Sequence, residues 1–138
     1  MRCLRSLLHI RWQDKIPNTE KLQQADMTSV HILLEKAQVR WAGHVCRMPD
    51  HRIPKQLLCG ELCLGKRAVG GQKKRFKNTL KASLKNLDIQ VDSWEELAQD
   101  RSIWRSLIHT GAQTAEERKT HIAEQKRTLR KTRAASTT

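Results

Sequence analysis

The sequence predicts a mostly α-helical protein, with a small helical domain over residues 1–110 and a polar helix with a disordered basic tail over residues 111–138. Several segments repeat apolar residues at the i, i+3, i+4, i+7 spacing of an amphipathic helix. Prolines and glycines punctuate these segments. Aromatic residues make up only 4% of the 138 residues and none is tyrosine, so the core must be thin and built from aliphatic side chains and four tryptophans.

The first half of the chain contains three predicted helices. Leucines at helical spacing predict a helix over residues 1–10, and Pro17 prevents this helix from continuing. A short helix is expected over residues 19–25. Ser29 can then cap a long helix that ends before Pro49, and its expected buried stripe is Val30, Leu33, Leu34, Ala37, Trp41, Val45 and Met48. Residues 52–65 are ambiguous between an irregular segment and a short β-hairpin.

The second half begins with a glycine-rich basic loop over residues 65–72. A helix of about 15 residues should follow, since its apolar positions recur at helical spacing; they are Phe76, Leu80, Leu84 and Leu87. Asp92 and Asp100 are predicted to cap two further short helices, and Gly111 to end the second of them. From residue 113 the pattern is polar and predicts a solvated helix.

Charge is the strongest compositional signal. The net charge is +13 at pH 7, from 27 Lys and Arg against 14 Asp and Glu. Two basic blocks, residues 59–87 and 126–138, flank the acidic block 88–125. Such a balance is typical of a protein that binds a polyanion, so we expect nucleic acid as the partner, bound through its phosphate backbone.

The sequence also predicts where in the cell the protein is found. No apolar run approaches the roughly 20 residues that cross a bilayer, and the opening segment lacks a signal-peptide cleavage site. We therefore expect an intracellular protein without membrane partners, whose cysteines are reduced thiols. The basic run from Lys126 to Arg133 could be a nuclear-import signal, a nucleic-acid arm or a generic solvated tail.

A row of lysines is the leading candidate for phosphate binding. It spans about 18 Å at 1.5 Å per residue, although like charges four residues apart repel in a free helix. The Gly70–Gly71 turn could bring backbone N–H groups to an anion. The alternative is a face that only confers solubility. The candidate residues of this region are Lys66, Arg67, Gly70, Gly71, Lys73, Lys74, Lys77, Lys81 and Lys85.

The stretch "VRWAGHVCRM" (Val39–Met48) is the second candidate. Arg40, His44 and Arg47 share one helix face at spacings of four and three. This face either contacts phosphates or is an ordinary solvated surface. Trp41 is interpreted as a core residue in preference to a platform on which bases stack.

Metal and catalytic sites are not expected. His44 and Cys46 point about 200° apart on a continuous helix, which argues against a zinc site with Cys59 and Cys63. The acidic residues around Asp92 are better explained as a helix cap with acids in the first turn. We therefore predict no enzyme activity, no metal and no cofactor.

Four segments resemble the region that follows the polymerase in reverse transcriptases of non-LTR (LINE-type, RTE-like) retrotransposons. They are "CLRSLLHIRWQDKIPN" (Cys3–Asn18), "VRWAGHVCRMPDHRIPKQL" (Val39–Leu57), "GKRAVGGQKKRFKNTLKASLK" (Gly65–Lys85) and "SWEELAQDRSIWRSL" (Ser93–Leu107). The resemblance implies a region that helps to hold template RNA or target DNA in a polyprotein with endonuclease and RNA-directed DNA polymerase activities. Arg40, Trp41, Gly43, His44, Arg47 and residues 70–73 match its motif positions.

The polymerase signature is missing from this sequence, since no Asp-Asp pair occurs in it. Met1 matches an internal methionine of the longer polyprotein, so the resemblance implies a truncated copy. Three hypotheses for the function follow: a nucleic-acid-binding fragment, a module that packs on the polymerase thumb, and a non-functional translated remnant.

Overall fold

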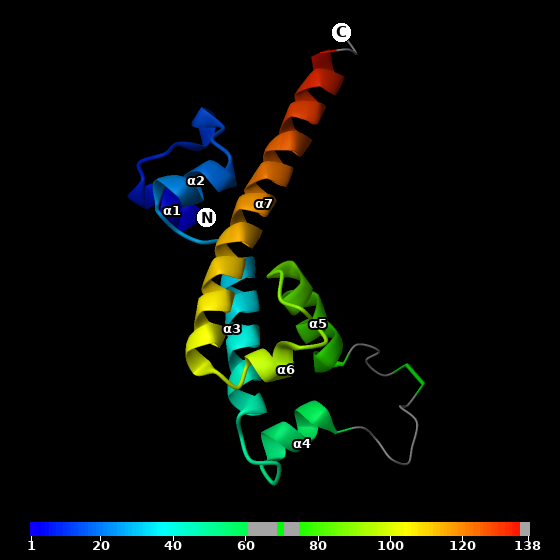
Figure 1. Cartoon of the computed structure of the whole chain (residues 1–138). Coiled ribbons are helices and arrows are strands. Elements are labelled where there is room, and N and C mark those ends of the chain that lie inside the picture. The colour runs from blue at the N-terminus through cyan, green and yellow to red at the C-terminus, as the bar shows by residue number, and fades with distance from the viewer. Residues whose placement is uncertain (61–68, 71–74, 136–138) are drawn as a thin grey trace. The chain divides into compact units, whose positions relative to one another are not determined.

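The computed structural model describes residues 1–60, 69–70 and 75–135. Within these ranges the protein contains helices and no strand (Figure 1), which confirms the mostly α-helical fold class. The elements are α1 (Arg2–Leu7), η1 (Trp12–Asp14, a 3-10 helix), α2 (Asn18–Gln24), α3 (Val30–Cys46), α4 (Ile53–Cys59), α5 (Phe76–Asn86), α6 (Trp94–Leu97) and α7 (Arg101–Ala135).

The described structure forms two compact units. The first comprises residues 1–33 and 114–138, and the second comprises residues 34–113. Both α3 and α7 contribute residues to each unit. The predicted boundary after residue 110 does not coincide with a helix end, because α7 continues through it as one helix of 35 residues.

Helices α1, α2 and α5 are each followed by a left-handed residue that is not glycine. His9, Asp26 and Asp88 follow α1, α2 and α5 with φ angles of 53°, 49° and 56°. In each case the next backbone N–H reaches back 2.9 Å to a carbonyl in the last turn, as from Ile89 to Leu84. This is the hydrogen bond of a Schellman cap, which satisfies carbonyls that the helix leaves unpaired. Because glycine usually fills this position, the sequence alone did not mark these ends.

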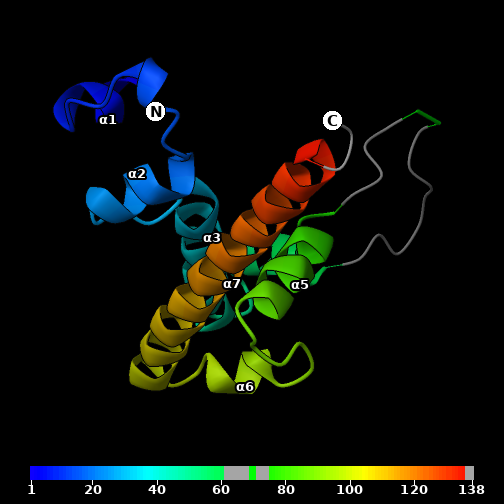
Figure 2. The same cartoon turned by 90° about the horizontal axis from the view of Figure 1, so that it is seen from above.

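The second unit holds most of the described core. Trp94 and Trp104 lie at its centre with ring centroids 6.1 Å apart. In Figure 1, α5 lies beside α3, and Figure 2 shows from above how the chain passes from α5 to α6. The buried apolar residues of this unit are Val39, Ala42, Val45, Cys46, Leu58, Leu80, Leu84, Leu87, Ile89, Trp94, Ala98, Trp104, Ile108 and Ala112.

Helices α3 and α5 run antiparallel in this unit. The Asn86 amide donates 2.8 Å hydrogen bonds to the Glu35 carboxylate, and the Ser83 hydroxyl donates a 3.1 Å bond to the Gln38 side chain. From one contact to the other the residue number rises along α3 and falls along α5, so the two helices run in opposite directions. These contacts select which face of α3 meets α5.

The predicted stripe of α3 is partly wrong. Val45 is buried, but Val30, Leu33, Leu34 and Trp41 are exposed, while Ile32, Val39, Ala42 and Cys46 are buried instead. Helical spacing identifies residues that share a face, yet α3 is apolar over more than one face. Its packing against α5 and α7 decides which face is buried.

Two further predictions need correction. The ambiguous segment 52–65 contains a helix, α4, rather than a hairpin or irregular chain at residues 53–59, and Pro54 fits the first turn of that helix; residues 61–65 lie outside the described ranges. Gly111 does not end a helix. A Cβ at Gly111 would lie 2.2 Å from the Leu87 carbonyl oxygen, so glycine allows close packing at that point.

The two aspartate caps had different outcomes. The Asp100 carboxylate accepts the backbone N–H groups of Ser102 and Ile103 at 2.7 and 3.0 Å, which confirms it as the cap of α7. Asp92 does not occupy the cap of α6, since Ser93 holds that position.

Candidate nucleic-acid interface

The inner side of the Val39–Met48 motif, which carries Gly43 and Arg47, makes packing contacts within the second unit. Gly43 lies against Trp104 of α7, and a Cβ there would come within 2.0 Å of the indole Nε1. Trp104 is only 1% exposed, and its Nε1 has no hydrogen-bond partner among the described residues. The glycine of the motif therefore lets the largest buried side chain of the unit approach α3 closely.

Arg47 also serves the fold. Its guanidinium Nη1 donates a hydrogen bond to the backbone carbonyl of Ala98, the residue that follows α6. A cation at the carbonyl end of a helix is favourable because the unpaired carbonyls carry partial negative charge. Arg47 was predicted to share a phosphate-binding face with Arg40 and His44, and the structure gives it a contact inside the second unit.

The outer side of the motif consists of Arg40, Trp41 and His44, all of which are exposed. The expectation that Trp41 is a core residue is wrong, since its side chain is 45% exposed. Trp41 meets Phe76 of α5 edge to face, with ring centroids 5.2 Å apart and planes at 87°. Phe76, 41% exposed, was predicted only as part of the apolar stripe of its helix.

The lysine row lies partly on α5. Lys81 and Lys85 each stand two residues from the buried Ser83, which turns them to the opposite side of the helix. Both are exposed, and in the part of the chain that the structure describes neither is paired with a carboxylate. Lys77 is less exposed and its Nζ lies 3.4 Å from the Cys59 carbonyl oxygen at the end of α4.

The remaining predicted residues of this region lie outside the described ranges, with one exception. Lys66, Arg67, Gly71, Lys73 and Lys74 fall in residues 61–68 and 71–74. Gly70 is described and has a φ angle of +85°, the left-handed conformation that glycine adopts readily. Helix α5 begins at Phe76, later than the sequence pattern indicated.

A groove of about 430 Å³ lies between α4, α5 and residues 91–95, which include the start of α6. Its lining includes cations from α5, Lys77 and Lys81, and the carboxylates Asp92 and Glu95. The mixed charge makes it a poor pocket for a phosphate, because a nearby carboxylate repels a bound anion. Lys81 lies at this groove and is also exposed, whereas Lys85 is exposed and does not line the groove, so the exposed side of α5 that carries Lys85 is the better candidate.

Cys46 behaves as a core residue. Burial, with the Glu95 carboxylate adding to it, raises the pKa of the Cys46 thiol, so it stays protonated at neutral pH. His44 is exposed on the same continuous helix while Cys46 is buried. Over the described residues, no three His, Cys, Asp or Glu side chains gather in a way that could hold a metal ion.

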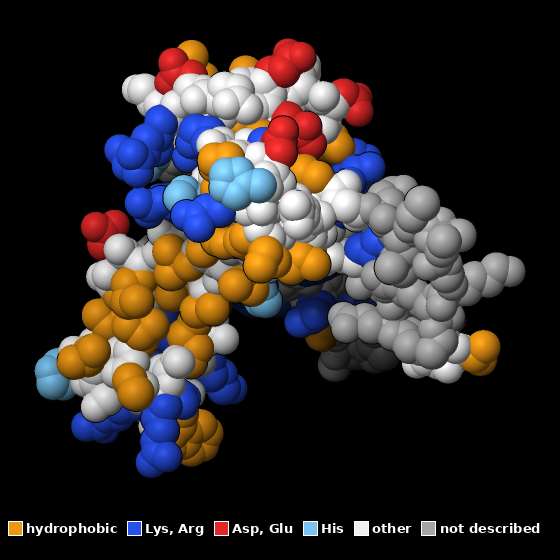
Figure 3. Space-filling model, turned by 90° about the horizontal axis from the view of Figure 1, so that it is seen from below, with side chains coloured by type: hydrophobic (Ala, Val, Ile, Leu, Met, Phe, Trp, Pro, Cys, Tyr) orange, Lys and Arg blue, Asp and Glu red, His pale blue; other side chains and the backbone are white. Residues whose placement is uncertain are grey.

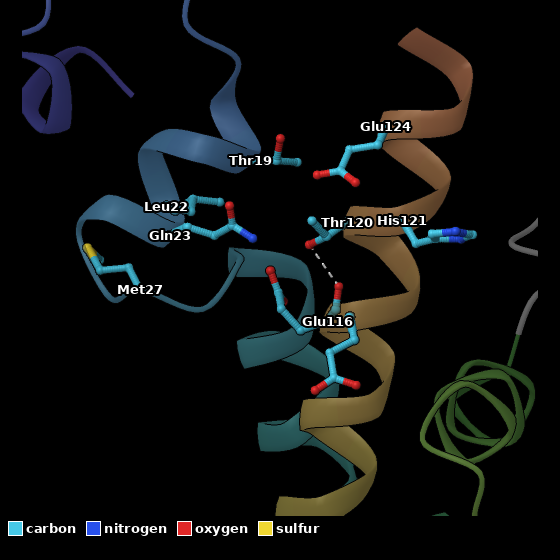
Figure 4. Close-up of a pocket in the computed structure, with 9 residues that line it drawn as sticks. Thr19, Leu22, Gln23, Met27, Glu116, Thr120, His121 and Glu124 are labelled. Atoms are coloured by element: carbon cyan, nitrogen blue, oxygen red, sulfur yellow. Dashed lines mark hydrogen bonds between the residues drawn. The ribbon is translucent and has the colours of Figure 1, made fainter. Parts of the chain in front are cut away.

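The first unit contains a separate pocket of about 340 Å³ that the sequence did not indicate (Figure 4). Glu124 of α7 points toward Thr19 of α2, whereas His121 points away. Glu116 accepts the Ser29 hydroxyl at 2.8 Å and the Ser29 backbone N–H at 3.3 Å. Glu116 thereby joins α7 to the start of α3 within this unit.

Comparisons with protein-family models, with curated proteins and with solved structures find no match to this chain. The retrotransposon origin thus stays a prediction from the sequence. Across the described residues, no helix combines the length and apolar character needed to cross a membrane.

Proposed function

We propose that the chain binds the phosphate backbone of nucleic acid, with Lys81 and Lys85 on α5 and Arg40 and His44 on α3 as the described contacts. The observation that carries the proposal is the outward side of α5, where two exposed lysines lack a carboxylate partner among the described residues. Template RNA and target DNA are the candidate ligands.

The energetics of α5 support this role. Lysines four residues apart repel by a few tenths of a kcal/mol per pair, so the helix alone gains nothing from them. A phosphate strand would remove this repulsion, and each neutralised phosphate would release condensed counterions. The net charge of +13 adds a long-range attraction for any polyanion.

The resemblance to the post-polymerase region of LINE-type retrotransposons supports the same proposal. In that setting, the role of this region is to hold RNA or DNA. The support comes from the Arg40–Met48 and Gly65–Lys85 strings. Gly43 and Arg47 have packing roles in this fold, which accounts for two of those motif positions without a ligand.

Binding of labelled single-stranded RNA, measured by fluorescence anisotropy over a salt series, tests the proposal. The variant Lys81→Gln/Lys85→Gln should weaken binding and flatten the slope of log K against log salt by about 0.7 per lost contact. The matched control is Arg101→Gln/Arg105→Gln, which removes the same charge from two exposed positions four residues apart on α7. Equal effects of the two variants would mean generic charge attraction without an α5 site, and an unchanged slope in both would refute the proposal.

A second candidate function is a module that packs on another protein, as on the polymerase thumb of an intact element. Leu34, Ala37 and Trp41 favour it, because they are exposed at spacings of three and four on α3. Hydrophobic side chains also gather on the surface shown in Figure 3, with Lys, Arg and His side chains beside them. In this case the glutamine variants would leave RNA binding unchanged, and Leu34→Glu would abolish any self-association of the isolated chain.

A further inference from the structure

The Trp41–Phe76 pair is the least explained feature of the second unit. Two large rings from different helices meet at the surface, and neither is fully buried. An edge-to-face contact occupies a face of only one of the two rings. Aromatic surface therefore remains open to a ligand beside α3.

Basic residues neighbour this pair along the chain. Arg40 directly precedes Trp41, and His44 lies one turn further along α3 on the outer side. Lys77 directly follows Phe76 on α5. An aromatic surface flanked by cations differs from the apolar rim of a protein interface, where charged residues are depleted near the centre.

We propose that the exposed Trp41–Phe76 pair is a stacking platform for a base of single-stranded nucleic acid, with Arg40 and His44 holding the neighbouring phosphates. The inference rests on the proposed nucleic-acid binding and names its substrate class. A base must leave its own stack before its flat face can meet an aromatic ring. A duplex presents only base edges and backbone, so it would engage the cations without the platform.

The experiment compares Trp41→Leu with the native chain on a short single-stranded RNA and on a duplex of similar charge. Leucine keeps apolar surface and net charge but removes the ring. We expect single-strand affinity to fall about 5- to 150-fold, the range for loss of one base–aromatic contact. Duplex affinity and the salt slope should not change.

Two more variants guard against a folding defect. Trp41→Phe retains a ring and should recover most of the single-strand affinity, whereas Leu34→Ala, on the same helix, should have no effect. Trp41 fluorescence is read in a Trp12→Phe background, because Trp12 is 73% exposed, as the difference from the same protein with Trp41→Leu, which cancels the emission of Trp94 and Trp104. This difference signal should be quenched by single strands and not by duplex.

Two outcomes would overturn the platform: native affinity in Trp41→Leu, or an equal loss on single strands and duplex. Nucleic-acid binding itself would still stand if Lys81→Gln/Lys85→Gln flattened the salt slope in the same assay. If the native chain bound neither nucleic acid at low salt, the platform and the proposed function would both fail.

Discussion

The inner and outer sides of α3 contrast within a single short motif. On the inner side, Gly43 admits Trp104 and Arg47 donates to the Ala98 carbonyl. On the outer side, Arg40, Trp41 and His44 are exposed. Residues of the same chemical type therefore have different tasks, and a motif with a functional appearance is here partly a packing motif.

The largest expected effect is on the inner side, from Gly43→Ala. Alanine normally stabilises a helix by up to about 1 kcal/mol over glycine. The new Cβ would collide with Trp104, so we expect a net loss of about 1–3 kcal/mol in the free energy of unfolding, measured by urea denaturation. In a Trp104→Leu background the same change should cost much less, and an equal cost in both backgrounds would contradict the packing role.

Arg47→Gln should have the next largest effect. It removes a charge-assisted hydrogen bond to the Ala98 carbonyl, for which we expect a loss of about 1–2 kcal/mol. Urea denaturation measures it, with Arg52→Gln as a control that removes an exposed arginine just beyond the motif. A shift no greater than that of the control would show that the contact adds nothing to stability.

Arg40→Gln/His44→Gln should alter the outer side alone. We expect weaker single-strand RNA binding and a flatter salt slope, because cationic contacts to phosphate are lost. The free energy of unfolding, measured by urea denaturation, should change by less than about 0.5 kcal/mol, as for exposed substitutions generally. A large stability loss with unchanged binding would reverse the assignment of this side.

The smallest effect concerns the turn after α3. The Lys55 Nζ donates a 2.9 Å hydrogen bond to the Met48 carbonyl and lies 2.8 Å from the Asp50 carboxylate. The hydrogen bond between Lys55 and Asp50 lowers the pKa of Asp50. The stability that it contributes is complete above the ordinary Asp pKa of 3.8 and is lost as pH falls through the lowered value. Asp50→Asn should thus be slightly less stable than the native chain at pH 7 and equal to it in strong acid. A gap that persists in strong acid would point to another cause.

Sequence periodicity predicted most helices because that signal is local. It placed α3 and most of α5, although α5 begins later than the pattern indicated, and it misjudged α4, where residues 53–59 have no clear stripe. The Asp100 cap was predicted from its residue type. Gly111 was treated as a stop signal, although the reason for this glycine is a carbonyl from another helix. Such tertiary contacts leave no mark in the local pattern.

The candidate site, like the fold, was predicted only as far as local spacing determines it. Spacing correctly put Arg40 and His44 on one face, and Lys81 and Lys85 on another. It could not separate Arg47 from Arg40, since the difference is the position of α6. Nor could it bring Phe76 to Trp41, which requires the antiparallel packing of α5 on α3.

The most direct test of the division within α3 is the pair Arg40→Gln and Arg47→Gln. The two substitutions make the same chemical change seven residues apart on one helix. We would measure urea unfolding and the salt dependence of single-strand RNA binding on both proteins. We expect Arg40→Gln to weaken binding at unchanged stability and Arg47→Gln to lower stability at an unchanged salt slope. The reverse pattern, or the same pattern in both variants, would contradict this division.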